Sequence, residues 1–322
     1  MPRISIIMPV YNAAATIERS LQSIADQDYK DYELVVVDDC STDNSAQIVN
    51  SYAAKHNMGY SIITQDKNSG VASARNIGLR AAQGDYLCFV DADDILAPRA
   101  LSIALEAALQ CGSDIVGWDW NLCFGKNSRH MVQKDYNSSG EALRNLFCGV
   151  MRWNLWLYLF RRRLIVDNHL SFLEGENMGE DMQFVLKAFQ ASSKVTQIHQ
   201  MLYNYNAVNS ASISKQFSES RRKEINANVS EVCGFFFDKI ENVEWLEFLK
   251  LNIKQPLLVS GKKSDYLLWK EWMPEANSFA LKNKLLPLRT RILQWCAAVG
   301  LWPAVKLYYL LIYRFVYGVL FK

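Results

Sequence analysis

Residues 85–94 read DYLCFVDADD, an apolar run that ends in a group of carboxylates. The continuous apolar residues 86–90 are typical of a strand buried on both faces. Asp91, Asp93 and Asp94 follow within four positions, and like charges this close repel each other and resist leaving water. The stretch therefore predicts a buried strand that ends either in a solvated turn or at a site for a divalent cation.

Three further apolar runs precede this one, and segments with helical periodicity separate them. The predicted strands are residues 4–8, 34–37, 61–64 and 86–90, and the predicted helices include residues 43–55, 70–82 and 98–110. Continuous apolar strands that alternate with helices indicate a parallel sheet covered on both faces. We therefore expect an α/β fold of Rossmann-like type with a mostly parallel sheet. From residue 217 onward the pattern is helical throughout.

Polar turn residues follow three of the predicted strands. They read PVYN at 9–12, DDCSTD at 38–43 and DADD at 91–94. Ligands of open α/β sheets bind at the carboxyl ends of the strands, where these three loops would meet. This convergence favours the cation site over the solvated turn. Asp38 and Asp43 also suit the start of the following helix, an alternative that stays open.

Charge is unevenly placed along the 322 residues. Residues 1–100 hold 8 Lys and Arg against 13 Asp and Glu, whereas residues 282–322 hold seven basic residues and no acidic one. The seven cysteines lack metal-ligand or redox spacing, which indicates reduced thiols in a reducing compartment. The front half shows no basic and aromatic pattern for nucleic acid, and the N-terminus shows no signal-peptide pattern, so we expect a cytoplasmic protein.

The last segment, about residues 285–322, is apolar, aromatic and basic. Its longest uncharged run is the 14 residues 292–305, and it contains Pro303. A membrane-spanning helix needs about 20 apolar residues, so a spanning segment is not expected. The composition favours an interfacial helix on an anionic membrane surface at the inner face of the cell membrane. A buried helix or an oligomer contact is the alternative.

Four segments together resemble a known family. They read ISIIMPVYNAAATIERSLQSI, YELVVVDDCSTDNS, NSGVASARNIGLRAAQGDYLCFVDADD and GEDMQFVLKAF, in this order over about residues 3–215. They are similar to the family 2 glycosyltransferases, which use the GT-A fold and invert the anomeric centre. The resemblance implies a nucleotide-sugar-binding half at 1–98, an acceptor-binding half at 99–215 and a helical C-terminal region at 216–322.

The resemblance also implies the donor site. It implies that Asp39 accepts a hydrogen bond from the base, that Asp91 contacts the ribose, and that Asp93, with Asp91, coordinates Mn²⁺ or Mg²⁺. The full set of nucleotide-sugar-binding residues that it implies is Pro9, Tyr11, Asp39, Arg75, Asp91 and Asp93. Arg75 would neutralise the diphosphate or pair with a nearby carboxylate. Asp94 would hold a metal-bound water or serve the turn.

The acceptor half carries the catalytic residue that the resemblance implies. Asp181 in GED matches the family's general base, which takes a proton from the acceptor hydroxyl. Glu180 would hold the local structure or touch the acceptor, and Trp156 would stack on a sugar or belong to the core. Near Trp156 the sequence departs from the family pattern, because Leu157 and Tyr158 stand where Asn and Lys are usual. Tyr203, Tyr205 and Ser212 are further, weaker candidates for binding.

We therefore expect an inverting, metal-dependent glycosyltransferase that moves a sugar from a nucleotide-sugar, with UDP as the expected nucleotide, to a saccharide or lipid-linked acceptor. Bacterial cell-surface polysaccharide or glycolipid synthesis is the expected context. A sugar nucleotidyltransferase and a catalytically silent sugar-nucleotide-binding or membrane scaffold protein are the alternatives.

Overall fold

The computed structural model describes residues 3–56, 58–125, 127–207, 217–312 and 314. The chain divides into two compact units. Unit 1 comprises Met1–Ala142 and Trp153–Val232, and unit 2 comprises Leu143–Arg152 and Cys233–Lys322. The sequence motifs end at residue 215, whereas the boundary between the compact units falls after Val232, within a long helix.

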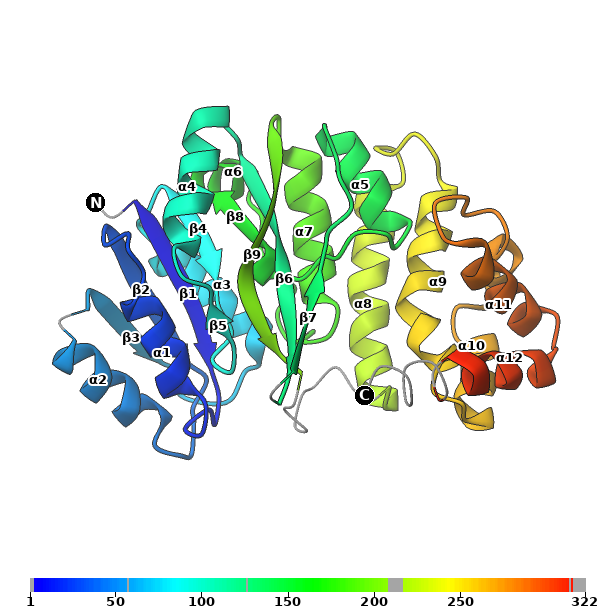
Figure 1. Cartoon of the computed structure of the whole chain (residues 1–322), viewed down its shortest axis with the longest axis horizontal. Helices are drawn as coiled ribbons and strands as arrows, with labels where there is room; N and C mark the ends of the chain where they lie inside the picture. Colours follow the sequence, from blue (N-terminus) through cyan, green and yellow to red (C-terminus); the bar gives the residue numbers. More distant parts are fainter. Residues whose placement is uncertain (1–2, 57, 126, 208–216, 313, 315–322) are drawn as a thin grey trace. The chain divides into compact units, whose positions relative to one another are not determined.

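Unit 1 contains a nine-stranded sheet in the part of the chain that the structure describes (Figure 1). Its order is β3-β2-β1-β4-β8-β6-β9-β5, with β7 paired to β6. The strands are β1 (Ile4–Val10), β2 (Tyr32–Asp38), β3 (Tyr60–Thr64), β4 (Tyr86–Phe89), β5 (Ile95–Leu96), β6 (Ile115–Phe124), β7 (Asn127–Met131), β8 (Tyr158–Arg161) and β9 (Val195–Asn206). Strands β1 to β4 are parallel, and β8 joins β4 and β6 in antiparallel pairs. The predicted α/β fold with a parallel sheet is confirmed.

Helices cover both faces of the sheet. They are α1 (Ile17–Ala25), α2 (Ser45–Lys55), α3 (Val71–Ala81), α4 (Ala100–Cys111), α6 (Arg162–Asp167) and α7 (Glu180–Ala191). Figure 1 shows α1 and α3 on opposite sides of β1. The apolar face of α3 packs Ala74 on Val35 and Val37 of β2. The backbone of α3 also comes so close to β1 that a Cβ at Gly78 would meet the Ile7 side chain.

Two local features have no clear signal in the sequence. The polar stretch after β6 contains β7, whose first four residues are exposed. The first helix begins at Ile17, and Asn12 in the preceding turn has a positive φ of 50°. Asn12 binds the neighbouring loop instead of capping the helix.

Unit 2 is helical, as the sequence predicts. Its elements are α9 (Glu244–Leu258), α10 (Lys263–Glu271), the 3-10 helix η3 (Pro274–Phe279), α11 (Leu288–Ala298) and α12 (Trp302–Tyr308), while α5 (Ser139–Phe147) and α8 (Glu219–Phe236) each span the division between the units. The fully buried Lys254 of α9 donates to the carbonyls of Trp272 and Met273 and to the amide oxygen of Asn277, at 2.6–2.9 Å. This lysine therefore ties α9 to the segment that leads into η3. In the described part of the chain, we find no helix with the length and apolar character needed to cross a membrane.

Candidate active site

The loops at the carboxyl ends of β1 and β2 are bound to each other. Their strands pair in register up to Val10 and Asp38. Beyond the strands, the Asn12 side chain accepts the Thr42 N–H at 2.8 Å, and the Asp43 carboxylate accepts the Ala14 N–H at 2.9 Å. Asp43 also accepts the N–H of Ser45, the first residue of α2, so it serves the helix start as the structural alternative proposed. The predicted convergence of these loops is present.

The DADD loop follows β4 on the same edge and is anchored by α1. Its backbone carbonyls accept hydrogen bonds from Ser20, which reaches Ala92 at 3.0 Å and Asp94 at 2.5 Å. The guanidinium of Arg19 donates to the Asp93 carbonyl at 3.0 Å. The position of the Asp91–Asp93 pair is therefore fixed through its main chain.

Asp94 is a structural residue in this loop. Its side chain is fully buried and accepts hydrogen bonds from the Tyr203 hydroxyl at 3.0 Å and the Asn206 N–H at 2.7 Å. Burial, and then the charge of Asp91, raises the pKa of Asp94 well above its usual value. The Tyr203 hydroxyl also accepts the Asp91 N–H at 3.1 Å. Asp94 and Tyr203 therefore join the DADD loop to β9.

Arg75 gathers three carboxylates from distant parts of the chain. Its guanidinium donates to Asp181 at 2.7 Å, to Glu180 at 2.8 Å and to Asp91 at 3.4 Å. Arg75 is 4% exposed. Burial opposes its charge, but the three carboxylates outweigh burial and raise the pKa of Arg75. The structure shows the pairing with carboxylates, which is one of the two roles that the sequence left open for Arg75.

The carboxylates around Arg75 outnumber its single positive charge. Burial, with the nearby Asp181, raises the pKa of Glu180 to about 8, although Arg75 opposes the shift. Burial likewise raises the pKa of Asp91 to about 6, with Arg75 lowering it and Asp181 and Asp93 raising it. The cluster therefore carries excess negative charge that a proton or a bound cation would offset.

Asp181 lies at the amino end of α7, directly after the left-handed Gly179 at φ 85°. One carboxylate oxygen accepts from Arg75, and the other accepts the Leu155 N–H at 3.2 Å. These contacts fix the plane of the carboxylate while 16% of the side chain stays exposed. The group is held in one orientation and reachable from solvent, as a general base must be. Glu180 is more deeply buried on Arg75, which supports its role in the local structure.

Asp39 organises the loop that begins α3. Its carboxylate accepts the N–H groups of Ser69 and Gly70, at 2.7 and 2.8 Å, and the side-chain amide of Gln65 at 2.7 Å. A carboxylate has about four acceptor positions, so one is left for a base N–H. At the amino end of α3, the Asn177 amide oxygen accepts the Ala72 N–H at 3.1 Å. Sequence reasoning missed Asn177, which lies 105 positions from its partner.

The other predicted side chains differ in exposure. Pro9 is half-buried near the end of β1, where it pairs with Val37, and Tyr11 directly follows that strand with half of its surface exposed. Trp156 is 4% exposed and stacks on Tyr203 with ring centroids 4.5 Å apart. Of the two roles that the sequence left open for Trp156, the structure shows the place in the core, because packing encloses its ring.

The remaining weak candidates add little to the site. Tyr205 also stacks on Trp156, with centroids 5.4 Å apart. Ser212 lies outside the described residues.

A metal would need oxygen ligands at this edge. Among the described residues, no group of three or more His, Cys, Asp or Glu side chains is arranged to hold an ion. Asp91 and Asp93 nevertheless provide the hard oxygen donors that Mg²⁺ and Mn²⁺ prefer, and the excess negative charge around Asp91 favours a cation. The residues present therefore fit a metal that takes its other ligands from a bound diphosphate.

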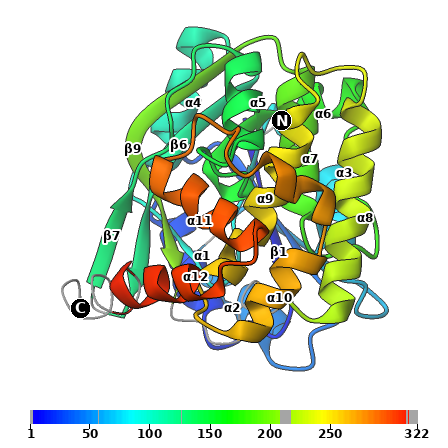
Figure 2. The same cartoon turned by 90° about the vertical axis from the view of Figure 1, so that its right-hand side faces the viewer.

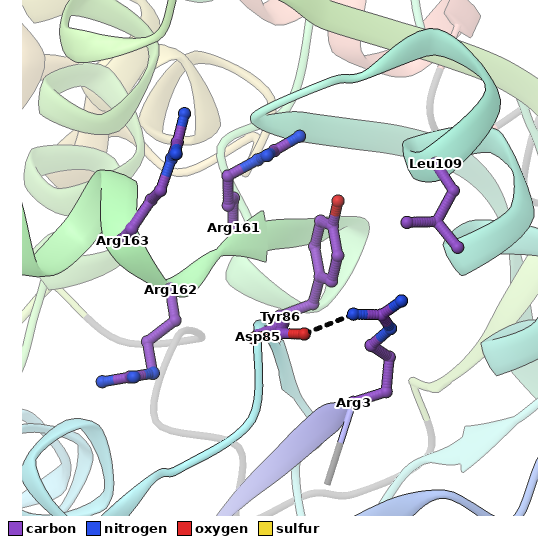
Figure 3. A pocket seen from close by; sticks show the side chains of 7 residues that line it. All are labelled: Arg3, Asp85, Tyr86, Leu109, Arg161, Arg162 and Arg163. Carbon is purple, nitrogen blue, oxygen red and sulfur yellow. Dashed lines mark hydrogen bonds and ion pairs between the residues drawn. The ribbon is translucent and has the colours of Figure 1, made fainter. Parts of the chain in front are cut away.

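A hollow of about 300 Å³ lies at the opposite edge of the sheet (Figure 3). It is lined by Arg3, Asp85, Tyr86, Leu109, Arg161, Arg162 and Arg163. Tyr86 is the first residue of β4, whereas Asp91 follows the last, so this hollow is at the far end of the strand from the carboxylates. Arg3 pairs with Asp85 at 2.6 Å, and Figure 3 shows Arg162 and Arg163 turned away from the Tyr86 ring. The hollow is separate from the candidate active site.

A comparison of the sequence with family models identifies its family. Residues 5–185 match the model of glycosyl transferase family 2, more than half of the chain. The chain belongs to this family. The predicted resemblance to the family is confirmed.

Curated relatives extend the comparison. The uncharacterized glycosyltransferase EpsJ of Bacillus subtilis is 33% identical over 212 residues, which cover 64% of this chain and 61% of EpsJ. The cholesterol galactosyltransferase of Borreliella burgdorferi is 28% identical over 291 residues, which cover 84% of this chain and 80% of that enzyme. Because this chain spans about three-fifths of EpsJ, the activity, substrates and partners of the whole protein are matters for proposal.

A solved structure supports the fold. Residues 1–349 of TarS from Staphylococcus aureus, crystallised with UDP-GlcNAc, superpose with a TM-score of 0.70 at 20% identity, covering 96% of this chain and 91% of that one. The GT-A fold that the sequence predicts is therefore confirmed, including its helical C-terminal region.

Proposed function

We propose that this enzyme is an inverting, metal-dependent glycosyltransferase that uses a UDP-sugar and acts on a hydroxyl of a saccharide or lipid-linked acceptor. The observation that carries the proposal is the meeting of Asp91 and Asp181 on the Arg75 guanidinium. A donor-site carboxylate and a candidate base from opposite halves of the family domain thus share one buried cation. Transfer from a nucleotide-sugar requires both groups at one place.

The donor would bind along the carboxyl ends of β1, β2 and β4. Asp39 has an acceptor position left for the N–H of uracil, and Tyr11 offers an exposed ring beside it. Uracil is supported by the TarS structure, which holds UDP-GlcNAc, although its likeness to this chain is one of fold. We assign Pro9 and Asp91 to the same donor site from their positions on this edge.

Asp181 would act as the general base. Its carboxylate takes the proton of the acceptor hydroxyl while the hydroxyl oxygen bonds to the anomeric carbon, and the bond from that carbon to the UDP oxygen breaks. Attack from the face opposite the leaving group inverts the configuration. Arg75 and the Leu155 N–H hold the carboxylate oriented for this transfer.

Asp93, with Asp91, would hold Mn²⁺ or Mg²⁺. When bound, such an ion supplies positive charge that stabilises the leaving diphosphate. The protein's part is the loop that fixes both carboxylates, through the hydrogen bonds from Ser20 and Arg19 to its backbone carbonyls.

We also propose a lipid or lipid-linked acceptor and a peripheral location at a membrane. The cholesterol galactosyltransferase matches 84% of this chain, which supports a lipid or lipid-linked acceptor. The basic and apolar segment 285–322 supports a peripheral position at an anionic membrane surface, which for a bacterial enzyme of cell-surface polysaccharide or glycolipid synthesis would be the cytoplasmic face.

The test is donor turnover. The full chain is incubated with a panel of UDP-sugars, Mn²⁺ and a membrane lipid extract, and released UDP is measured. We expect Asp181→Asn to lower the rate by about 10²-fold or more, the typical contribution of a general base, while UDP binding stays within about twofold of wild type. An Asp181→Asn enzyme as fast as wild type would remove Asp181 from the mechanism. Wild type inactive with every donor would count against UDP.

A further inference from the structure

Helix α11 presents an apolar stripe to solvent. Leu288, Ile292, Trp295 and Val299 follow each other at spacings of four, three and four residues and are 41–59% exposed. At 100° per residue, these four side chains fall within a sector of about 60°. Leu293, Gln294 and Ala297 lie on the opposite side of the helix and are buried. The helix therefore packs on unit 2 with one face and leaves a second apolar face uncovered.

Further exposed apolar side chains follow α11 in the sequence. Leu301, Leu307 and Leu311 are 45–56% exposed, and α12 lies beside α11 (Figure 2). Several exposed apolar side chains on neighbouring elements mark an interaction surface more often than isolated ones do. We call Leu288, Ile292, Trp295, Val299, Leu301, Leu307 and Leu311 the α11–α12 surface.

Basic residues border the α11–α12 surface. On the helical wheel of α11, Arg289 and Arg291 fall on opposite sides of the stripe, about 80° from its centre. Residues 282–322 contain seven Lys and Arg and no Asp or Glu. An apolar stripe with Trp and flanking arginines suits the boundary between lipid headgroups and acyl chains.

We propose that the α11–α12 surface binds directly to an anionic lipid bilayer. The apolar side chains enter the acyl boundary and the arginines contact lipid phosphates. This inference deepens the proposed peripheral location by naming the surface that produces it. A second copy of the chain is a less suitable partner for the α11–α12 surface. Pairing two such surfaces would bring the basic residues of both segments 282–322 together, and these segments contain no acidic residue to balance them.

Vesicle flotation with the full chain tests the inference. Vesicles of phosphatidylcholine alone are compared with vesicles that also contain phosphatidylglycerol. We expect wild type to float with the anionic vesicles, and to float less at high salt. The double variant Ile292→Ser with Trp295→Ser should lower partitioning by at least about tenfold, because two large side chains no longer enter the lipid.

A matched control removes exposed apolar side chains elsewhere in unit 2. Phe237→Ser with Val243→Ser changes one aromatic and one aliphatic residue, which are 72% and 53% exposed, and should float as wild type does. Thermal unfolding checks that each variant is folded. Arg289→Gln should lower partitioning into anionic vesicles and leave binding to neutral vesicles unchanged.

Three outcomes would overturn the inference. Wild type could stay unbound with anionic vesicles, the stripe variant could float as well as wild type, or light scattering could show a dimer that depends on the stripe while flotation fails. Flotation does not depend on sugar transfer. A bound but inactive enzyme would therefore contradict the proposed function alone, and an active but unbound enzyme would contradict this inference alone.

Discussion

Tyr203→Phe would remove one hydroxyl and keep the ring that stacks on Trp156. The hydroxyl donates to Asp94 at 3.0 Å and accepts the Asp91 N–H at 3.1 Å, and both Tyr203 and Asp94 are fully buried. Losing a hydrogen bond to a buried carboxyl group and leaving a buried N–H unsatisfied together lower the free energy of unfolding by about 2–4 kcal/mol. For a unit of this size, the melting temperature should fall by roughly 5–15 °C.

The same hydroxyl also positions the Asp91–Asp93 loop, which gives a second measurement. We expect the Mn²⁺ concentration for half-maximal UDP release to rise by about tenfold, as when a residue that supports a metal ligand is lost. Tyr60→Phe is the control, because it removes an exposed hydrogen bond to Asn50 and should change neither quantity. A Tyr203→Phe enzyme that melts within about 1 °C of wild type would refute the energetic reasoning. One that melts lower with an unchanged Mn²⁺ requirement would refute the positioning role.

Two further predictions concern pH. Hydrogen bonds to Asp119 and then Asp135 raise the pKa of His199 above its value of about 6.5 in the unfolded chain. The protonated ring therefore stabilises the fold below about pH 6.5, and this stabilisation is lost as pH rises through the pKa of the folded state. The ring is half exposed, so we expect a loss of roughly 0.5 kcal/mol, measured by urea unfolding between about pH 6 and pH 8 and absent in His199→Gln. Burial lowers the pKa of Lys254 to about 7, below its value in the unfolded chain. The free energy of unfolding should therefore rise as pH rises from about 7 towards 10, because the folded protein then holds Lys254 uncharged. Lys254→Met should abolish that rise and lower the free energy of unfolding by about 2–4 kcal/mol, because three acceptor oxygens lose their donor; an unchanged pH profile would contradict this.

The parallel half of the sheet was predictable because its strands are buried on both faces. Residues 34–37 of strand β2 are a run of Leu and Val, and all four are buried. Such runs are visible in a single sequence without any alignment. Strand β7 reads NSRHM and is exposed over its first four residues, so it lacks both an apolar run and an alternation. Its pairing with β6 comes from backbone hydrogen bonds, which leave no trace in side-chain pattern.

The candidate site was predictable as a set of carboxylates but not as a network. Loops that follow parallel strands must meet at one edge, so Asp39 and Asp91 could be placed together. Nothing in the sequence ties Arg75 to Asp181, which lies 106 positions away, or Asn177 to the amino end of α3. Trp156 shows the same limit, since a buried and a sugar-stacking tryptophan have the same local sequence.

The network around Arg75 also separates the roles of two adjacent acids that the sequence left ambiguous. Burial and the neighbouring Asp181 raise the pKa of Glu180, and its side chain is more deeply buried than that of Asp181, so Asp181 is the acid that an acceptor hydroxyl reaches more easily. The guanidinium of Arg75 carries one positive charge and contacts the carboxylates of Glu180, Asp181 and Asp91. Negative charge therefore exceeds positive charge next to the donor edge, where Asp91 lies. We infer that a divalent cation at Asp91 and Asp93 offsets this excess and prepares the edge for the donor, whose diphosphate itself brings negative charge.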